Sequence, residues 1–450
     1  MNPANIITAN SSDLLKRILL FTIIMLLCNI TYGQKARKPV SDQPKKFRAA
    51  VVKTNITPVD SQYLIGYQER KSTGVNDSIY QKVVILDDGI TQFLLVSTEI
   101  CILSPAEYDR IASKIKKQFG IDPVNFWWST THTHSAPEGG DPGIYQIYMG
   151  ERNKHEVDAG YTAMIERKLF EGITGARKKL TPARLGAGWG YSQANINRRA
   201  VDVDGMASLG LNPDGPVDRK IGLLKIEKED GTPIALISNY PIHGTVMSGS
   251  NLLISGDAPG IVSEYVEQKT GAPVIFINGA AGNIAPIYSV YPTPRAGHLG
   301  EFRVLLGDRI VEAYNKIYTT TSKVTLKAES LTIEIPRKPD MGWPADHAKY
   351  TRKTGTGSNL VLFPVRLLRI NDDIAIWSAP VELFCEISNE IRDRSPFPFT
   401  FYYGYTNGWF GYFVADSEYK YGGYEPRVSP FTEGAGRSLI EGVVSNLEGK

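Results

Sequence analysis

The chain has 450 residues, 42% of them hydrophobic and 22% charged, which is typical of a globular protein with one large domain or a few ordinary ones and excludes a disordered chain. Its 50 basic and 47 acidic side chains nearly balance, so no charge excess favours nucleic acid or another polyanion as a partner. Three cysteines are too few for a disulfide framework or a cysteine-rich zinc module.

The N-terminus resembles an export signal. Lys16 and Arg17 precede an apolar run, residues 18–28, and a small residue, Gly33, stands before Gln34. This pattern predicts a signal peptide over residues 1–33, with an uncleaved N-terminal anchor as the alternative. A polar, basic linker is expected over residues 34–46. The mature protein should therefore be secreted or periplasmic.

The elements that follow mix strands and helices. In chain order we expect a strand at 93–100, a helix from Ser104 to Phe119, a strand at 124–129, a helix at 157–179, a hairpin of strands 221–227 and 233–240, a helix at 258–269, a strand at 274–278, a helix at 301–318, a hairpin of strands 361–370 and 374–378, a helix at 381–394, a strand at 399–405 and a last helix at 437–447. Strict βαβ alternation is absent. The pattern predicts one large α/β catalytic domain over residues 47–450, with mixed β-sheets flanked by helices.

The strongest local signal is the pair His132 and His134, which follows an apolar strand. Alternate side chains of an extended segment point the same way, so both imidazoles can face one site. They could act as two metal ligands, or as a ligand and its neighbour. Polar residues at the end of a buried strand are a common setting for a functional site.

The remaining histidines divide into two groups. His243 also follows an apolar strand, and it is either a third member of the site or a hydrogen-bonded core histidine. His155, His298 and His347 lie in polar or helical surroundings and are expected at the surface. The two cysteines of the mature chain lie in apolar segments and are expected to be core thiols, with a disulfide between them as the alternative.

Glu382 is the candidate carboxylate. It follows the predicted strand 374–378 at the start of a predicted helix, where an acid can also simply interact with the helix dipole. A set of two histidines and one carboxylate leaves zinc an open coordination position, as catalysis requires. Bound zinc lowers the pKa of water to about 7.

The ordered motifs resemble those of the neutral, non-lysosomal ceramidases. They are residues 131–137 (THTHSAP), 195–198 (NINR), 242–245 (IHGT), 255–257 (SGD), 380–382 (PVE) and the aromatic loop 407–425. Together they extend over roughly residues 47–440, in the order found in that family. The family consists of secreted or surface zinc amidases that cleave the N-acyl bond of ceramide.

The resemblance implies a role for each matching residue. Zinc would be held by His132, His243, Glu382 and Tyr412, of which the tyrosine follows from the resemblance alone. The resemblance also implies that His134 transfers a proton or supports the ligands, that Arg198 binds or polarises the substrate, and that Tyr424 steadies the oxyanion. Asp257 is either a partner of a ligating histidine or a helix cap.

The sequence departs from the family at two places. Ala285 stands where family members carry a serine, so a nucleophilic role of that serine is not open to this chain. No C-terminal immunoglobulin-like domain is expected, because the chain ends soon after Tyr424. Both departures affect the ceramide assignment more than the zinc-hydrolase assignment.

These observations predict a zinc-dependent, ceramidase-like amidase that acts on a small-molecule or lipid substrate, with transient contact to a membrane surface. One alternative is a metal-dependent hydrolase of the same scaffold that acts on another substrate, such as a glycan. A second alternative is a non-catalytic glycan- or lipid-binding protein that uses the aromatic loop as a stacking platform.

Overall fold

A computed structural model describes residues 46–141, 143–150, 154–289, 296–355, 357 and 359–449. The expected signal peptide, residues 1–33, and nearly all of the expected linker lie outside these residues. The chain divides into two units, Met1–Lys45 and Lys46–Lys450, and every element below belongs to the second. Within the described residues, no helix has both the length and the apolar character needed to cross a membrane.

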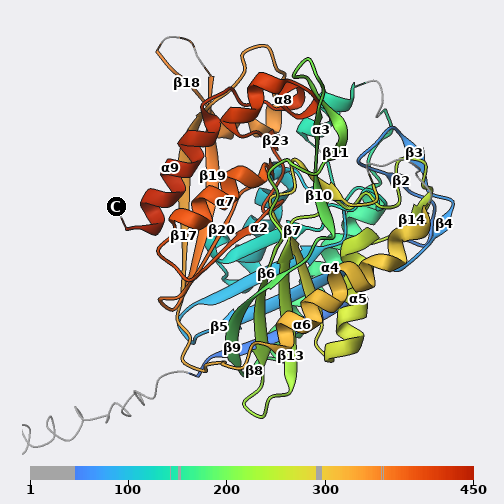
Figure 1. The fold of residues 1–450 in the computed structure, drawn as a ribbon. Helices are drawn as coiled ribbons and strands as arrows, with labels where there is room; N and C mark the ends of the chain where they lie inside the picture. Colours follow the sequence, from blue (N-terminus) through green and yellow to red (C-terminus); the bar gives the residue numbers. More distant parts are fainter. Residues whose placement is uncertain are drawn as a thin grey trace, which may run out of the picture. The chain divides into compact units, whose positions relative to one another are not determined.

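The first sheet has the strand order β7-β6-β5-β1-β8 and is covered by two helices (Figure 1). Helix α2, Pro105–Phe119, begins as predicted, because the Ser104 side chain accepts a hydrogen bond from the Glu107 N–H and Gly120 ends it in the left-handed conformation. Helix α4 spans Ala159–Lys178. The strands are β1 (Arg48–Asn55), β5 (Tyr80–Asp87), β6 (Gln92–Thr98), β7 (Phe126–Thr130) and β8 (Thr181–Pro182).

The second sheet has the order β15-β13-β12-β9 and packs against α5 (Asp257–Thr270) and α6 (Arg309–Asn315). The predicted hairpin is confirmed as β12 (Lys220–Glu227) and β13 (Pro233–Tyr240), and β15 (Val274–Asn278) has the predicted bounds. Strand β9 spans Arg184–Tyr191.

The third sheet has the order β17-β19-β20-β22, and β18 (Thr351–Lys353) pairs with β19. Its strands are β17 (Leu326–Pro336), β19 (Asn359–Ile370), β20 (Ile374–Ser378) and β22 (Phe399–Tyr403). Helices α7 (Cys385–Arg394) and α9 (Ala435–Leu447) lie along this sheet in Figure 1, in orange and red. The predicted hairpin and the predicted last helix are thus confirmed.

One apolar core joins the three sheets. It includes Leu95 and Trp127 from the first sheet, Ile237 from the second, and Ile376 and Tyr403 from the third, all buried. Separate apolar clusters then join each sheet to its own helices. Burial at about 25 cal/mol per Å² of apolar surface drives this packing. The predicted mixed α/β domain is therefore confirmed.

The described residues also form shorter elements. They are β2 (Tyr63–Leu64), β3 (Arg70–Lys71), β4 (Gly74–Val75), β10 (Asn195–Val201), β11 (Ala207–Asn212), β14 (Leu253–Ile254), β16 (Ile284–Pro286), β21 (Glu382–Leu383), β23 (Tyr412–Phe413), α3 (Ile144–Met149), α8 (Tyr424–Val428) and the 3₁₀ turns Pro123–Asn125, Ala296–Glu301, Ala345–Tyr350 and Asp416–Tyr421.

Several details differ from the sequence prediction. Glu382 lies in the short strand β21 and not in a helix, since α7 begins only at Cys385. The predicted helix 301–318 is broken into the 3₁₀ turn, a π-helical turn over Arg303–Asp308, and α6. His347 is buried, because its ring packs against Trp343 and Phe410. The two cysteines are free thiols, so the alternative of a disulfide is wrong.

Candidate metal centre

Three parallel strand pairs, one in each large sheet, direct their carboxyl ends to the site. The pairs are β6 with β7, β13 with β15, and β20 with β22. The loops after β7, β13 and β20 carry His132, His243 and Glu382, respectively. Loops at the carboxyl ends of parallel strands are the usual place for a ligand site in α/β proteins. The fold therefore brings together three residues that lie up to 250 positions apart in the chain.

His132, His243 and Glu382 form a compact buried cluster. Glu382 Oε2 lies 3.3 Å from His132 Nε2 and 3.0 Å from His243 Nε2. The three ligand-type atoms all lie within 4.8 Å of one another. The other carboxylate oxygen, Oε1, accepts a hydrogen bond of 3.0 Å from Trp409 Nε1.

Backbone carbonyls fix the orientation of both imidazole rings. His132 Nδ1 lies 2.9 Å from the Cys101 carbonyl oxygen, and His243 Nδ1 lies 2.9 Å from the Ile284 carbonyl oxygen. A carbonyl can only accept, so each Nδ1 carries the hydrogen and each Nε2 faces the cluster with a lone pair. Such an outer hydrogen bond is the usual support of a metal-ligating histidine.

The donor set fits a divalent metal ion. Glu382 Oε2 is buried and accepts no hydrogen bond, although it is the atom nearest to both Nε2 atoms. Two nitrogen lone pairs and a carboxylate oxygen that face one another repel unless a cation lies between them. Imidazole and carboxylate ligands suit zinc.

The pKa values of the three cluster members depend on burial and on one another. Burial would lower the pKa of His132, but Cys101 and Glu382 raise it to about 10. Burial and the nearby Arg198 lower the pKa of His243 to about 4. Burial alone would raise the pKa of Glu382, yet His132 and His243 hold it well below its usual value. A proton on His132 Nε2 and a metal ion would thus compete for the same place beside the buried carboxylate.

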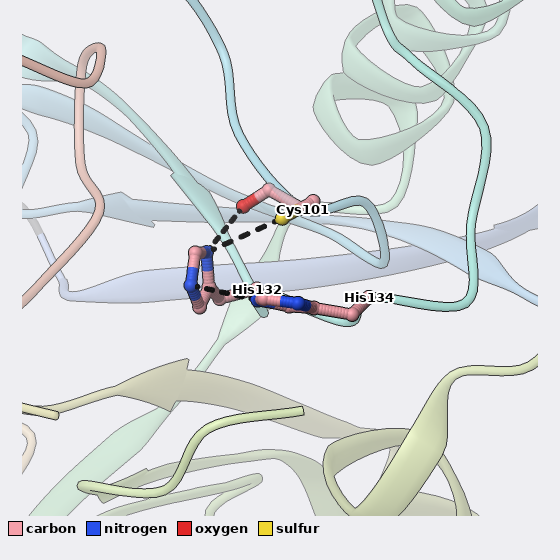
Figure 2. A group of neighbouring side chains, drawn as sticks. All are labelled: Cys101, His132 and His134. Carbon is pink, nitrogen blue, oxygen red and sulfur yellow. Dashed lines mark hydrogen bonds between the residues drawn. The ribbon is translucent and has the colours of Figure 1, made fainter. Parts of the chain in front are cut away.

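His134 lies beside this cluster. Figure 2 shows His132 contacting Cys101 through one ring nitrogen and His134 through the other. The two Nε2 atoms of His132 and His134 are 3.2 Å apart. They do not meet by strand alternation as predicted: β7 ends at Thr130, and His132 has a left-handed φ of 63°. Burial, then the two neighbouring histidines, lower the pKa of His134 well below its usual value, so the ring is neutral.

Cys101 is a member of the site that the sequence did not indicate. Its Sγ atom lies 3.6 Å from His132 Nδ1, and its carbonyl accepts the hydrogen of the same atom. The thiol therefore lies behind the ring, on the side away from Glu382. The signal that could have found it is its position three residues after β6, the parallel partner of β7.

Arg198, Tyr412 and Tyr424 lie on the other side of the cluster. Arg198 Nη1 is 3.1 Å from His243 Nε2, and Arg198 Nη2 donates a 3.1 Å hydrogen bond to Tyr412 Oη. Tyr412 is the cross-strand partner of Glu382 in the β21–β23 pair. The Tyr424 ring lies edge-on to the Tyr412 ring, with 5.6 Å between centroids. All seven residues singled out in the sequence therefore lie in one neighbourhood.

Asp257 has a different role from a histidine partner. Its carboxylate accepts backbone N–H groups from Val246, Met247 and Ala258. It therefore holds the segment after His243 against the first turn of α5, which is close to the predicted helix cap. Burial raises its pKa to about 6 despite these bonds.

Asn278, at the end of β15, joins the two histidine loops. Its side-chain amide donates to the carbonyls of Thr131 (3.2 Å) and Ile242 (2.7 Å), and its carbonyl accepts the Ile242 N–H (3.0 Å). Each of these partners immediately precedes a candidate ligand. Sequence reasoning missed this residue, because it ends an ordinary buried strand.

Asn278→Leu should loosen both histidine loops. The change leaves buried backbone groups without partners, so we expect a loss of about 1–3 kcal/mol in the free energy of unfolding, together with weaker zinc binding. Asn239→Leu is the matched control, since Asn239 also donates to buried carbonyls, those of Ile277, Asn278 and Tyr402. The control should lose stability and keep its zinc affinity. Denaturant unfolding and competition with a zinc chelator measure both; equal zinc affinities in all three proteins would contradict this role.

Gly66 allows a loop to lie directly on His134. It has φ of 106°, and a Cβ atom there would overlap His134 Nδ1 and approach Cγ to 2.5 Å. Its N–H donates to Tyr145 Oη at 3.1 Å, and Arg70 Nη2 donates to the His134 carbonyl at 2.6 Å. The segment from Gly66 to Arg70 thus fixes the second histidine from outside.

Gly66→Ala is expected to displace His134 and reduce turnover. The control is Gly120→Ala, at φ of 68°, where a Cβ meets no atom within 4 Å. Both variants carry the backbone strain of a left-handed alanine, about 1–2 kcal/mol. Only Gly66→Ala should also lower kcat, in parallel assays of the two proteins. If the two variants had the same kcat, contact with His134 would not matter.

A sequence model of the family described as neutral/alkaline non-lysosomal ceramidase, N-terminal, matches residues 47–283. The chain belongs to this family. The neutral ceramidase of Pseudomonas aeruginosa is 26% identical over 289 residues, which cover 60% of this chain and 41% of that protein. Neutral ceramidase B of Dictyostelium discoideum is 26% identical over 290 residues, 57% of this chain and 38% of that protein. The aligned region thus spans about two fifths of these relatives.

Solved structures of neutral ceramidases share the fold. The crystal structure of the Pseudomonas aeruginosa enzyme superposes with a TM-score of 0.70 at 19% identity, over 90% of this chain and 75% of that one. A structure of a ceramidase complexed with C2 gives 0.71 at 17% identity, with the same coverage. The likeness therefore extends through the third sheet, beyond the residues that the family model matches.

The family model covers only part of the candidate site. Residues 47–283 contain His132, His134, Arg198 and His243, while Glu382 and both tyrosines lie beyond them. Ala285 lies buried on β16 opposite Ile196 of β10. Arg198 is two residues further along β10.

Proposed function

We propose that this protein is a zinc-dependent hydrolase that cleaves an N-acyl amide bond in a ceramide-like lipid. The observation that carries the proposal is the buried Glu382 oxygen, which has no hydrogen-bond donor and lies between two imidazole lone pairs. Membership in the neutral ceramidase family supports the amide-cleaving class. His132, His243 and Glu382 would hold the ion, and Tyr412, beside Glu382, is the fourth candidate ligand.

A zinc ion held there supplies a Lewis acid and water activated at neutral pH. The protein's own groups then orient the substrate. Burial would lower the pKa of Arg198, but Tyr412, Glu425 and Glu382 raise it well above its usual value, so its guanidinium is a permanent cation. Arg198 would donate to the acyl carbonyl oxygen as negative charge develops there, and Tyr424 would assist from the same side.

His134 would transfer the proton. It is neutral in this surrounding, and its Nε2 faces the cluster, 3.2 Å from His132 Nε2. From there it would accept a proton from the attacking water and deliver it to the leaving amine. The Tyr67 ring packs edge-on against it at 4.8 Å between centroids, which keeps the imidazole in one orientation.

A second candidate is the same hydrolysis on a non-ceramide N-acyl compound or a glycan. The observation that favours it is Ala285, which puts a methyl group where ceramidases have a hydroxyl. Loss of that hydroxyl changes what can be recognised next to Arg198, without changing the proposed metal ligands.

Release of fatty acid from a short-chain ceramide by the purified protein tests the proposal. The assay is run with added zinc, with a chelator, and with zinc restored after chelation. Chelator-sensitive release would support the ceramidase assignment. A protein that binds zinc yet releases no fatty acid would contradict it, and the same preparation would then be assayed on other N-acyl amines and on glycans.

A further inference from the structure

A chain of four charged side chains leads from the protein surface to the candidate site. Glu418 Oε2 accepts from Arg199 Nε at 2.8 Å, Glu425 Oε2 accepts from Arg199 Nη1 at 2.7 Å, and Glu425 Oε1 accepts from Arg198 Nε at 2.9 Å. The side chain of Glu425 is 1% exposed and that of Arg199 is 2% exposed, whereas Glu418 reaches 14%. The inner carboxylate, Glu425, is thus shared by two buried guanidinium groups.

The contacts of Arg198 leave it one orientation. Nε is bound to Glu425, Nη2 donates to Tyr412, and Nη1 faces His243. The guanidinium is planar, so an anchor at Nε fixes the directions of both terminal nitrogens. An arginine without that anchor would sample several rotamers, because its long side chain has several rotatable bonds.

Glu425 also fixes the helix that carries Tyr424. It is the second residue of α8, directly after Tyr424. The preceding Gly423 has φ of 90° and lies so close to the Ala207 carbonyl of β11 that a Cβ would come within 2.7 Å of its oxygen. The same carboxylate therefore ties strand β10, which carries Arg198, to helix α8.

We propose that Glu425 is a positioning residue for the reaction: it holds Arg198 against Tyr412 and His243 so that the guanidinium meets the substrate carbonyl. This inference rests on the proposed hydrolase function. Glu425 acts through Arg198, whereas Glu418 is bound by Arg199 and belongs to the same charged chain without contacting Arg198.

The experiment compares Glu425→Gln with Glu418→Gln, which cuts the same chain at its outer end. A misplaced donor of charge stabilisation costs about 10²-fold in kcat, and we expect this loss in Glu425→Gln with KM unchanged. Glu418→Gln should keep the kcat of the unmodified protein. Glu425→Asp, which retains the charge on a shorter side chain, should fall between them.

A second arm separates positioning from a merely structural role. If Glu425 acts through Arg198, then Glu425→Gln should add no further loss of kcat in an Arg198→Met background. The inference is overturned if the loss is the same in both backgrounds, or if Glu418→Gln loses as much as Glu425→Gln. Should Glu425→Gln fail to fold, the Asp variant replaces it, and an unchanged kcat would then overturn the inference.

A third arm needs no turnover, and so separates this inference from the proposed function. Glu425→Gln leaves the buried guanidinium of Arg198, which faces His243, without its anionic partner, so zinc affinity should fall about tenfold by chelator competition. Removing that guanidinium as well, in Arg198→Met/Glu425→Gln, should restore it. If the unmodified protein hydrolyses no N-acyl substrate, the proposed function fails; unchanged zinc affinity in Glu425→Gln would then overturn the inference as well.

Discussion

Glu382→Gln is expected to abolish zinc binding and with it the proposed hydrolysis. The variant keeps the shape of the side chain and removes the only negative charge in the cluster of three ligand atoms. Loss of several kcal/mol of charge stabilisation corresponds to a fall in kcat/KM of about 10³-fold. Zinc content after dialysis and the rate of amide hydrolysis measure the two effects.

Glu386→Gln is the matched control for this variant. Glu386 is half-buried, four residues further on, where it accepts a 2.7 Å hydrogen bond from Asn283 Nδ2. Burial raises its pKa above the usual value. The control should retain zinc and activity. If Glu382→Gln retained zinc at the level of Glu386→Gln, the assignment of Glu382 as a ligand would be wrong.

Lys82→Met is expected to lower the free energy of unfolding more than Asn278→Leu or Gly66→Ala. Lys82 and Glu99 form a salt bridge of 2.7 Å in which both side chains are at most 2% exposed. Removing the lysine leaves a buried carboxylate without its partner, at a cost of about 3–5 kcal/mol in the free energy of unfolding. Lys82→Met/Glu99→Met should recover most of this loss, because the buried charge is then absent.

The pH dependence of Lys82→Met follows from Glu99. Burial raises the pKa of Glu99 even with Lys82 present, and loss of Lys82 raises it further. A carboxyl with a raised pKa binds its proton more tightly in the folded state, so stability rises as the pH falls towards the pKa of the unfolded chain. The deficit of Lys82→Met should therefore be smaller at pH 5 than at pH 7. Denaturant unfolding at both values tests this; a larger deficit at pH 5 would contradict it.

The salt bridge between Lys82 and Glu99 also supports the candidate site. Glu99 stands between Thr98 and Ile100, whose carbonyls accept the N–H groups of Thr131 and His132 at 3.0 Å. A disturbed Glu99 should thus displace the loop of the first candidate ligand. Lys82→Met is accordingly expected to weaken zinc binding, and the double variant to restore it.

The sequence predicts strands and helices well where local patterns decide them. Strand β15 and helix α2 have the predicted bounds because a continuous apolar run and a capping box are local signals. The sequence predicts that α7 begins at residue 381, four residues too early. Glu382 instead pairs with Tyr412 across β21 and β23, and no local signal indicates such a long-range pairing. The sequence also predicts His347 at the surface, because one of the aromatic rings that bury it, Phe410, lies far away in the chain.

The sequence predicts the residue types of the candidate site, but not the hydrogen bonds that hold those residues in place. Histidines after apolar strands are visible in a single sequence, whereas Asn278, Cys101 and Glu425 act through hydrogen bonds to groups more than 30 positions away. Their residue types are common in buried and turn positions. Only the three-dimensional arrangement distinguishes them from ordinary structural residues.

The origin of the site in all three sheets has a consequence for the order of folding. The candidate ligands His132 and Glu382 are separated by 250 positions and meet only when the first and third sheets have packed on their common core. A partly synthesised chain that stops before Glu382 can offer an ion only the histidines. Contacts so distant in the chain form late, since closing long loops is slow. Folding should therefore precede zinc uptake, and refolding followed by tryptophan fluorescence should have the same rate whether zinc is present from the start or added at the end.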